Sequence, residues 1–122
     1  MILELNTRLI EPDITVFEFV GKLTLGNALM DAERTVQKSI ESGSRKIVLD
    51  LSQLSIIDSA GIGLLVFCTS EMEKAHGKLC IAGPNSKVNN IFDVTHLQRV
   101  ISVFPDVDAA CAGFASTTAA GN

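Results

Sequence analysis

The residue with the clearest chemical potential is Ser59, whose hydroxyl follows the Asp58 carboxylate in the segment IDSAGIG, residues 57–63. The segment joins a strand-like run to a helical pattern, so we expect Ser59 at the N-cap of a helix. A serine there accepts a hydrogen bond from an otherwise unpaired backbone amide, which contributes about 1 kcal/mol. The amides and positive dipole of a helix N-terminus also favour an anion, so a phosphoryl group on Ser59 is compatible with this position.

Two glycines, Gly61 and Gly63, fall inside the first turns of the expected helix. Each costs up to about 1 kcal/mol relative to alanine at such a position. We interpret the missing side chains as room for a partner or a nucleotide to approach the backbone. The apolar residues nearby are too many for one helix stripe, so some should face outward and form a docking face. They are Ile62, Leu64, Leu65, Val66 and Phe67.

Short elements on both sides must position this segment. Two strand-like runs, residues 2–9 and 14–20, flank the turn-forming Glu11-Pro12-Asp13 and predict a hairpin, which Gly21 should end. The run at residues 46–51 is apolar without a break, which is typical of a central strand covered on both faces. The other predicted elements are a helix from Asn27 to Gly43, a helix from Ser59 to about Gly77, a strand at 78–82, a helix after Asn85 through Val94, a strand at 99–103 and a helix at 106–114.

This order predicts an α/β fold, with a mixed β-sheet covered by about four α-helices, because parallel crossovers place helices on the sheet faces. The chain has 122 residues, 47% of them hydrophobic, which suits a single domain that folds alone. We expect this domain at residues 1–114. The small and polar residues 115–122 predict a flexible C-terminal tail.

Charge and hydropathy exclude several classes of partner. Ten basic and 14 acidic residues give a net charge of −4, which disfavours nucleic acid and an anionic membrane surface. The longest apolar run, residues 62–68, is far shorter than the about 20 residues that a membrane span needs. The three cysteines are odd in number and lack C-x-x-C spacing, so we expect them to pack in the core of a cytoplasmic protein, without a metal.

The stretch IVLDLSQLSIIDSAGIGLLV, residues 47–66, resembles the signature of the STAS-domain anti-sigma factor antagonists, whose D-S-x-G-[LI]-G motif carries a regulatory phosphoserine. Gly21-Lys22-Leu23 resembles the G-x-L of that family after its second strand. Residues 91–97, IFDVTHL, resemble its third helix and the turn that follows. The likeness extends over nearly the whole chain and implies a single STAS-like domain in the cytoplasm.

By this resemblance, Ser59 is the phosphoacceptor and Asp58 its acidic neighbour. Thr24 stands where many members have Asp, which removes an acidic side chain from that loop. Ala60 replaces the Ser or Thr that often follows the phosphoacceptor, which leaves Ser59 as the only hydroxyl of the motif. The implied partner-binding residues are Asp58, Ala60, Gly61, Ile62, Gly63, Leu64, Thr24 and Asn27.

The function that the resemblance implies is partner switching. The unphosphorylated chain binds an anti-sigma factor that is also a serine kinase and thereby frees the sigma factor. Phosphorylation of Ser59 abolishes this binding, and a serine phosphatase restores it. The kinase supplies the ATP and magnesium, so the chain is a substrate, not an enzyme, and needs no cofactor. The alternative is a STAS module of a stressosome-like or transporter-associated complex.

Two catalytic alternatives fit the residues less well. Asp50 ends the predicted central strand, as in the aspartyl-phosphate site of a receiver domain, but the further carboxylates that hold magnesium there are missing. Ser59 with His76 or His96 as base would suggest a serine hydrolase. The segment lacks the leading glycine of G-x-S-x-G, however, and both histidines lie near predicted helix ends.

Overall fold

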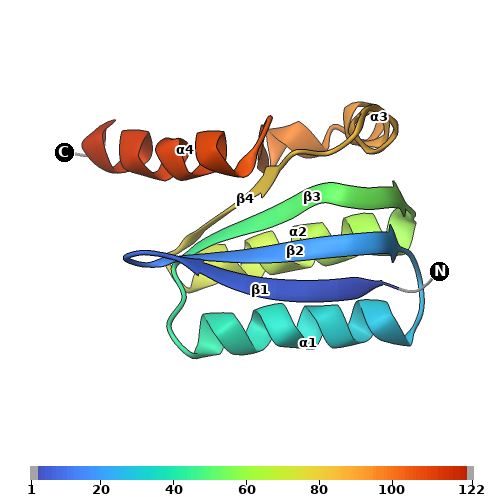
Figure 1. Ribbon diagram of the computed structural model, residues 1–122, viewed down its shortest axis with the longest axis horizontal. Helices are drawn as coiled ribbons and strands as arrows, with labels where there is room; N and C mark the ends of the chain where they lie inside the picture. Colours follow the sequence, from blue (N-terminus) through green and yellow to red (C-terminus); the bar gives the residue numbers. More distant parts are fainter. Residues whose placement is uncertain (1–2, 121–122) are drawn as a thin grey trace.

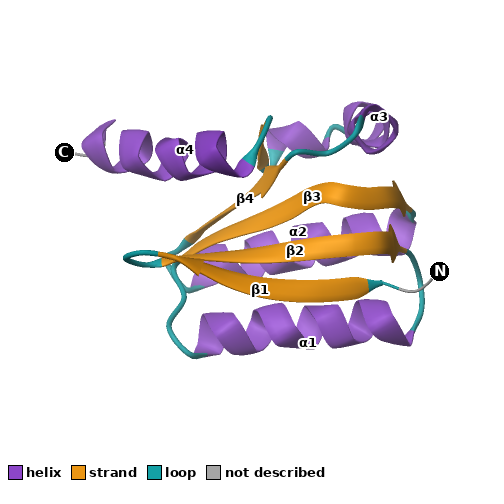
Figure 2. Ribbon diagram, in the orientation of Figure 1, coloured by secondary structure: helices purple, strands orange, loops and turns teal. Residues whose placement is uncertain are grey.

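A mixed sheet of five strands forms the centre of the structure, and helices lie on both of its faces (Figures 1 and 2). The computed structural model describes the backbone of residues 3–120 and the side chains of residues 3–114. The elements in chain order are β1 (Glu4–Ile10), β2 (Ile14–Leu23), α1 (Asn27–Glu41), β3 (Lys46–Ile57), α2 (Ser59–Lys74), β4 (Lys78–Ala82), α3 (Ser86–Thr95), a 3₁₀ turn (Leu97–Arg99), β5 (Ser102–Phe104) and α4 (Val107–Ala120).

The strand order in the sheet is β1-β2-β3-β4-β5. The hairpin pairs β1 with β2 antiparallel, and every later pair of neighbours is parallel. The predicted α/β class with a mixed sheet and four α-helices is therefore confirmed, as is the central position of β3.

Each face of the sheet has its own apolar cluster. The larger cluster combines side chains of β2, β3 and β4 with those of α1, α2 and α3. In α1, Leu29, Ala32, Val36 and Ile40 are buried at the helical spacing that was predicted. The smaller cluster packs Ala110 and Phe114 of α4 on the opposite face. Figure 1 shows α1 and α2 along one side of the strands and α4 along the other.

Gly21 does not end β2, contrary to the prediction. The strand continues to Leu23, and β3 likewise continues beyond residue 51 to Ile57. The pairing of the two strands shifts register on each side of Val20 and Gly21, and Gly21 has a φ of 108°, which glycine adopts without steric cost. The extended strands pair Leu23 with Ile57, immediately before α2 begins.

The C-terminal part also differs from the prediction. The strand expected at 99–103 is replaced by the 3₁₀ turn at Leu97–Arg99 and a later strand, Ser102–Phe104. The helix predicted to end at 114 runs to Ala120, so helical backbone enters the expected tail. The division between a domain at 1–114 and a flexible tail at 115–122 stays a prediction. Among the described residues, no helix has the length and hydropathy of a membrane span.

Candidate functional site at the start of α2

Asp58, and not Ser59, is the N-cap of α2. Its backbone is extended, and its Oδ1 accepts a hydrogen bond from the backbone N–H of Gly61 at 2.9 Å. Ser59 is the first helical residue, so the N-cap lies one residue earlier in the chain than predicted. Both residue types are good N-caps, so the sequence alone did not decide between them. The local reason for Asp58 is that β3 continues to Ile57, which leaves Asp58 as the first residue after the strand.

The Asp58 carboxylate also holds the loop between β2 and α1. Its Oδ2 accepts a hydrogen bond from the backbone N–H of Leu25 at 3.0 Å, while the Asp58 N–H donates to the Leu23 carbonyl at 3.3 Å. The hydrogen bond from Leu25, followed by that from Gly61, lowers the pKa of Asp58 below its usual value, because both favour the charged form. Asp58 is therefore an ionised carboxylate beside Ser59 at neutral pH.

Ser59 is exposed, and within the described part of the chain its hydroxyl has no hydrogen-bond partner. Because Asp58 caps the helix, this hydroxyl has no structural task at the helix start. It sits at the positive end of the α2 dipole, where an added anion is tolerated. The arrangement leaves the oxygen accessible to a modifying enzyme.

The two glycines of the motif have different physical roles. Gly61 is buried, and a Cβ added there would meet the Leu23 carbonyl oxygen and lie 2.5 Å from Ile57 Cγ1. Gly61 therefore admits the ends of β2 and β3, not an external partner, which corrects the interpretation of this position. Gly63 is exposed, and a Cβ added there would have no atom within 4 Å. Of these two glycines, Gly63 is the one whose backbone is exposed to solvent.

The other predicted partner-binding residues divide by exposure. Leu64 is buried in the larger cluster, so its side chain is not available to a partner, contrary to the prediction. Ala60 and Ile62 are partly buried and pack against the same cluster. Thr24, partly buried, lies in the loop that Asp58 holds, and Asn27 is the exposed first residue of α1. Leu64 and Gly61 thus support the site from inside.

Apolar side chains are exposed around this site, as the crowded pattern of α2 predicted. Val66 and Phe67, at the end of the second turn and the start of the third turn of α2, are each 41% exposed. The sequence reasoning missed Leu25, which is 80% exposed in the loop bound by Asp58, and the exposed Ile56 and Met30. The exposure of Leu25 could have been predicted from its place in the short loop between Leu23 and Asn27, because so short a loop cannot fold back to bury the side chain.

The structure gives no further support to the receiver-domain or serine-hydrolase alternatives. Asp50 lies within β3, seven residues before its end at Ile57, and accepts a hydrogen bond from the Ser52 N–H at 3.0 Å. His76 follows the far end of α2, about 25 Å from Ser59 at 1.5 Å per residue. His96 ends α3 with a left-handed φ of 57°. Among the described residues, no cluster of three His, Cys, Asp or Glu side chains could hold a metal.

Two of the three cysteines are buried in the interior, as predicted. Cys68 and Cys80 are buried, and burial raises the pKa of each thiol to about 12. Cys111 is partly buried against the smaller cluster, and desolvation raises its pKa as well. Such thiols are weak nucleophiles because the reactive thiolate is scarce.

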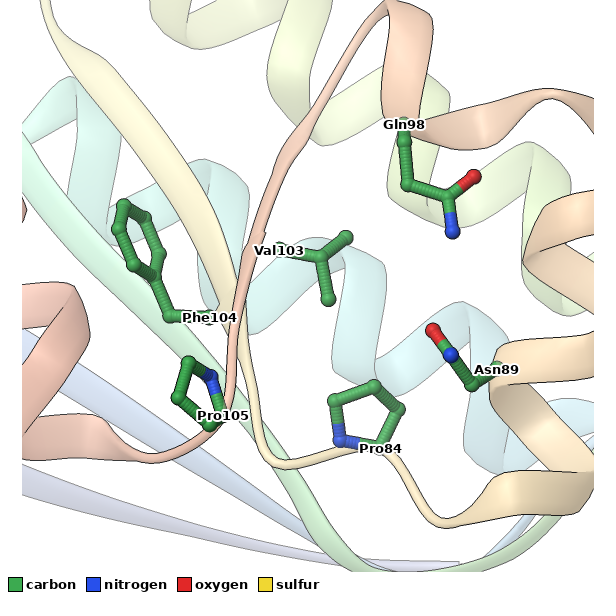
Figure 3. Close-up of a pocket in the computed structure, with 6 residues that line it drawn as sticks. All are labelled: Pro84, Asn89, Gln98, Val103, Phe104 and Pro105. Atoms are coloured by element: carbon green, nitrogen blue, oxygen red, sulfur yellow. The ribbon is translucent and has the colours of Figure 1, made fainter.

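A separate hollow of about 290 Å³ lies between α3, the 3₁₀ turn and the end of β5 (Figure 3). The side chains of Asn89 and Gln98 reach into the space beside Val103 and Pro84. No carboxylate, histidine, thiol or hydroxyl side chain lines it, so it offers no acid, base or nucleophile. Its lining residues are Pro84, Asn89, Gln98, Val103, Phe104 and Pro105.

Several known proteins with similar sequences or folds are named as anti-sigma factor antagonists, and transporter proteins share the fold as well. A Thermotoga maritima protein, provisionally named an anti-sigma factor antagonist, is 25% identical over 98 residues, which cover 80% of this chain and 87% of that protein. A crystal structure of such a protein from Thermotoga maritima superposes with a TM-score of 0.82 at 23% identity, covering 89% of this chain and 92% of that chain.

The anti-sigma factor antagonist SpoIIAA has the same fold in two chemical states. Its unphosphorylated form matches with a TM-score of 0.71 at 21% identity, over 82% of this chain and 87% of that chain. The phosphorylated form from Bacillus matches with a TM-score of 0.66 at 20% identity, over 82% and 90%. The model of the STAS domain matches residues 7–110, which span β1 to α4 and include the whole site around Ser59. The chain therefore belongs to the STAS domain family.

Proposed function

We propose that this protein is an anti-sigma factor antagonist that acts by partner switching through Ser59. Unphosphorylated, it binds an anti-sigma factor with serine kinase activity, and the sigma factor is released. The bound kinase then phosphorylates Ser59, the complex dissociates, and a serine phosphatase restores the first state. The chain is the substrate in this cycle, catalyses no step, uses no cofactor and works in the cytoplasm.

The observation that carries the proposal is the free hydroxyl of Ser59. It is exposed on the first residue of α2, while Asp58 performs the capping that would otherwise explain a serine at this place. Around it, Leu25, Val66 and Phe67 expose apolar surface of the kind that protein interfaces bury. A modifiable oxygen beside an apolar surface suits an interface that phosphorylation regulates.

Electrostatics explain why a phosphoryl group would act at the interface and leave the fold unchanged. A phosphoserine carries about −1.5 to −2 charges at neutral pH. The α2 dipole favours this charge, whereas the ionised Asp58 opposes it, so the two effects on the fold partly cancel. A partner docked over Ser59 would have to desolvate the new dianion. A coupling of about 1–3 kcal/mol changes affinity about 5–150-fold, enough for a switch.

The relatives support the same reading. Several similar proteins carry the name of anti-sigma factor antagonist, and SpoIIAA exists in an unphosphorylated and a phosphorylated form. The exposed surface around Ser59 supports the proposal that a partner of that class binds here.

The test is phosphorylation of the full chain by candidate anti-sigma factor kinases with ATP and magnesium. We expect intact-mass analysis to show one added phosphoryl group and peptide analysis to place it on Ser59. Ser86 provides a matched control, because it is also exposed and also the first residue of a helix that the preceding side chain caps. Ser59→Ala should abolish incorporation, whereas Ser86→Ala should leave it unchanged.

Binding measurements test the switch itself. Ser59→Ala should bind the kinase as tightly as the unmodified chain and stay bound when ATP is added. Ser59→Asp, with a charge in place of the hydroxyl, should bind at least about tenfold more weakly. Equal affinity of the wild type, Ser59→Ala and Ser59→Asp would refute control by this residue.

A further inference from the structure

β1 is an edge strand with neither a proline nor a bulge to prevent pairing. It is the first strand in the sheet order, and its outer side pairs with no other strand of the described chain (Figure 2). All seven residues pair with β2 in a regular register, so no bulge bends the edge, and the strand contains no proline. Proteins commonly block such edges with charged side chains, prolines or bulges. The two charged residues of β1, Glu4 and Arg8, have opposite signs, so a second copy can place each opposite its counterpart.

We propose that a second copy of this chain binds along β1. The two β1 strands would pair antiparallel about a two-fold axis that passes between the two copies of Asn6, and the two sheets would become continuous. Pairing through backbone hydrogen bonds at a sheet edge is an established recognition mode. None of the residues proposed to contact the kinase lies on β1, so the dimer and the switch use different surfaces.

Charge complementarity selects this register. With Asn6 on the axis, Glu4 of each copy lies directly opposite Arg8 of the other, on the same face of the sheet. A shift that centres the axis on Glu4 or on Arg8 places like charges opposite each other, which is unfavourable. Arg8 also lies 3.5 Å from Glu18 of its own chain, with its Nε nearest. The five N–H donors of a guanidinium suffice for both carboxylates.

The same register buries an exposed leucine on the opposite face of the strand. Leu3 and Leu5 pack against the larger apolar cluster, so the odd-numbered residues of this strand face α1 and α2. Leu9 shares that face, is 59% exposed, and lines a surface hollow of about 380 Å³ beside the hairpin. In the proposed pairing, Leu3 of the second copy lies opposite Leu9. One register thus satisfies both charges and covers Leu9.

Charge reversal in the full-length chain tests the proposal. We expect sedimentation velocity to show a concentration-dependent dimer for the wild type. Glu4→Arg and Arg8→Glu each place like charges at both symmetric positions, so each should weaken the dimer about tenfold or more. A mixture of the two variants restores opposite charges in the mixed pair and should form heterodimers at wild-type concentrations. The double variant Glu4→Arg/Arg8→Glu should likewise dimerise.

Glu73→Arg is the matched control, since it makes the same charge change at an exposed position of α2 and should leave the dimer unchanged. Circular dichroism melting confirms that each variant folds. As a second measurement, Asn6→Cys in a Cys111→Ser background should give a disulfide-linked dimer under mild oxidation, because Cys68 and Cys80 are buried.

A wild-type chain that remains monomeric at several hundred micromolar would overturn the proposal. So would a dimer that Glu4→Arg and Arg8→Glu leave intact, or variants that fail to recover when mixed. Weakened binding of a different protein by these variants, with the chain itself monomeric, would also overturn it, because β1 would then pair with a foreign strand.

Discussion

The Asp58 carboxylate accepts a hydrogen bond from the backbone N–H of Leu25, 33 residues earlier in the chain, at 3.0 Å. Its other oxygen accepts from Gly61 at 2.9 Å, so one side chain joins the loop before α1 to the start of α2. Asp58→Ala removes both acceptors and should lower the free energy of unfolding by about 2–3 kcal/mol. Asp58→Asn keeps one acceptor for the cap, and should lose only about 1 kcal/mol.

Urea denaturation at neutral pH measures both effects. Glu73→Ala is a suitable control because Glu73 is an exposed carboxylate on α2 whose side chain makes no hydrogen bond or ion pair with the described residues, and its removal should change stability by at most about 0.5 kcal/mol. If Asp58→Asn proves as stable as the wild type, the hydrogen bond to Leu25 contributes nothing to stability, and the loop is held by other contacts.

The lowered pKa of Asp58 predicts a pH dependence of stability. A carboxyl group whose pKa is lower in the folded state stabilises the fold at any pH above its unfolded pKa of about 3.9. That contribution is lost as the pH falls through the lower folded pKa, where the carboxylate binds its proton. Between about pH 5 and pH 2, the unfolding free energy of the wild type should therefore fall more steeply than that of Asp58→Asn. Parallel curves for the two proteins would contradict this assignment.

The exposed Ser59 hydroxyl predicts a substitution with no structural cost. Because Asp58 provides the cap, Ser59→Ala should change the unfolding free energy by less than about 0.5 kcal/mol. A capping role would instead give a loss of about 1 kcal/mol. Thermal and urea unfolding of Ser59→Ala distinguish the two, and a loss of the larger size would mean that the serine hydroxyl supports α2 after all. The result also decides whether Ser59→Ala is a clean variant for binding studies.

Hydrophobic periodicity was sufficient to predict most of the fold. The spacing of Leu29, Ala32, Val36 and Ile40 predicted α1 and its buried face, and the unbroken apolar run at residues 46–51 predicted the central strand. The errors lie where tertiary pairing overrides local signals. Gly21 looks like a strand end, yet the bulged pairing with β3 carries β2 on to Leu23. Local sequence contains no information about that partner strand.

The sequence predicted where the candidate site lies, but not which role each of its residues has. Asp58 and Ser59 are adjacent and chemically similar as caps, so only the end of β3 at Ile57 decides which residue caps α2. The hydrogen bond between Asp58 and Leu25 depends on the pairing of distant strands, which no local pattern encodes. Gly61 and Gly63 look equivalent in the sequence, although one faces Leu23 and Ile57 and the other faces outward.

These two glycines give a matched pair of substitutions two residues apart on the same helix. Gly61→Ala places a methyl group against the Leu23 carbonyl and the Ile57 side chain, and the carbonyl belongs to a paired strand that cannot move freely. We expect Gly61→Ala to lower the free energy of unfolding by about 1–3 kcal/mol. Gly63→Ala enters open space and replaces glycine inside a helix, so it should raise stability by up to about 1 kcal/mol.

Combined unfolding and binding measurements separate the structural role of Gly61 from the interface role of Gly63. If Gly63 presents bare backbone to the kinase, Gly63→Ala should weaken binding although it makes the chain more stable. Gly61→Ala should instead bind in proportion to the fraction of chain that remains folded. A Gly61→Ala protein of wild-type stability would contradict the close packing of α2 on Leu23. Unchanged binding of Gly63→Ala would place the partner's contacts elsewhere, on Leu25, Val66 or Phe67.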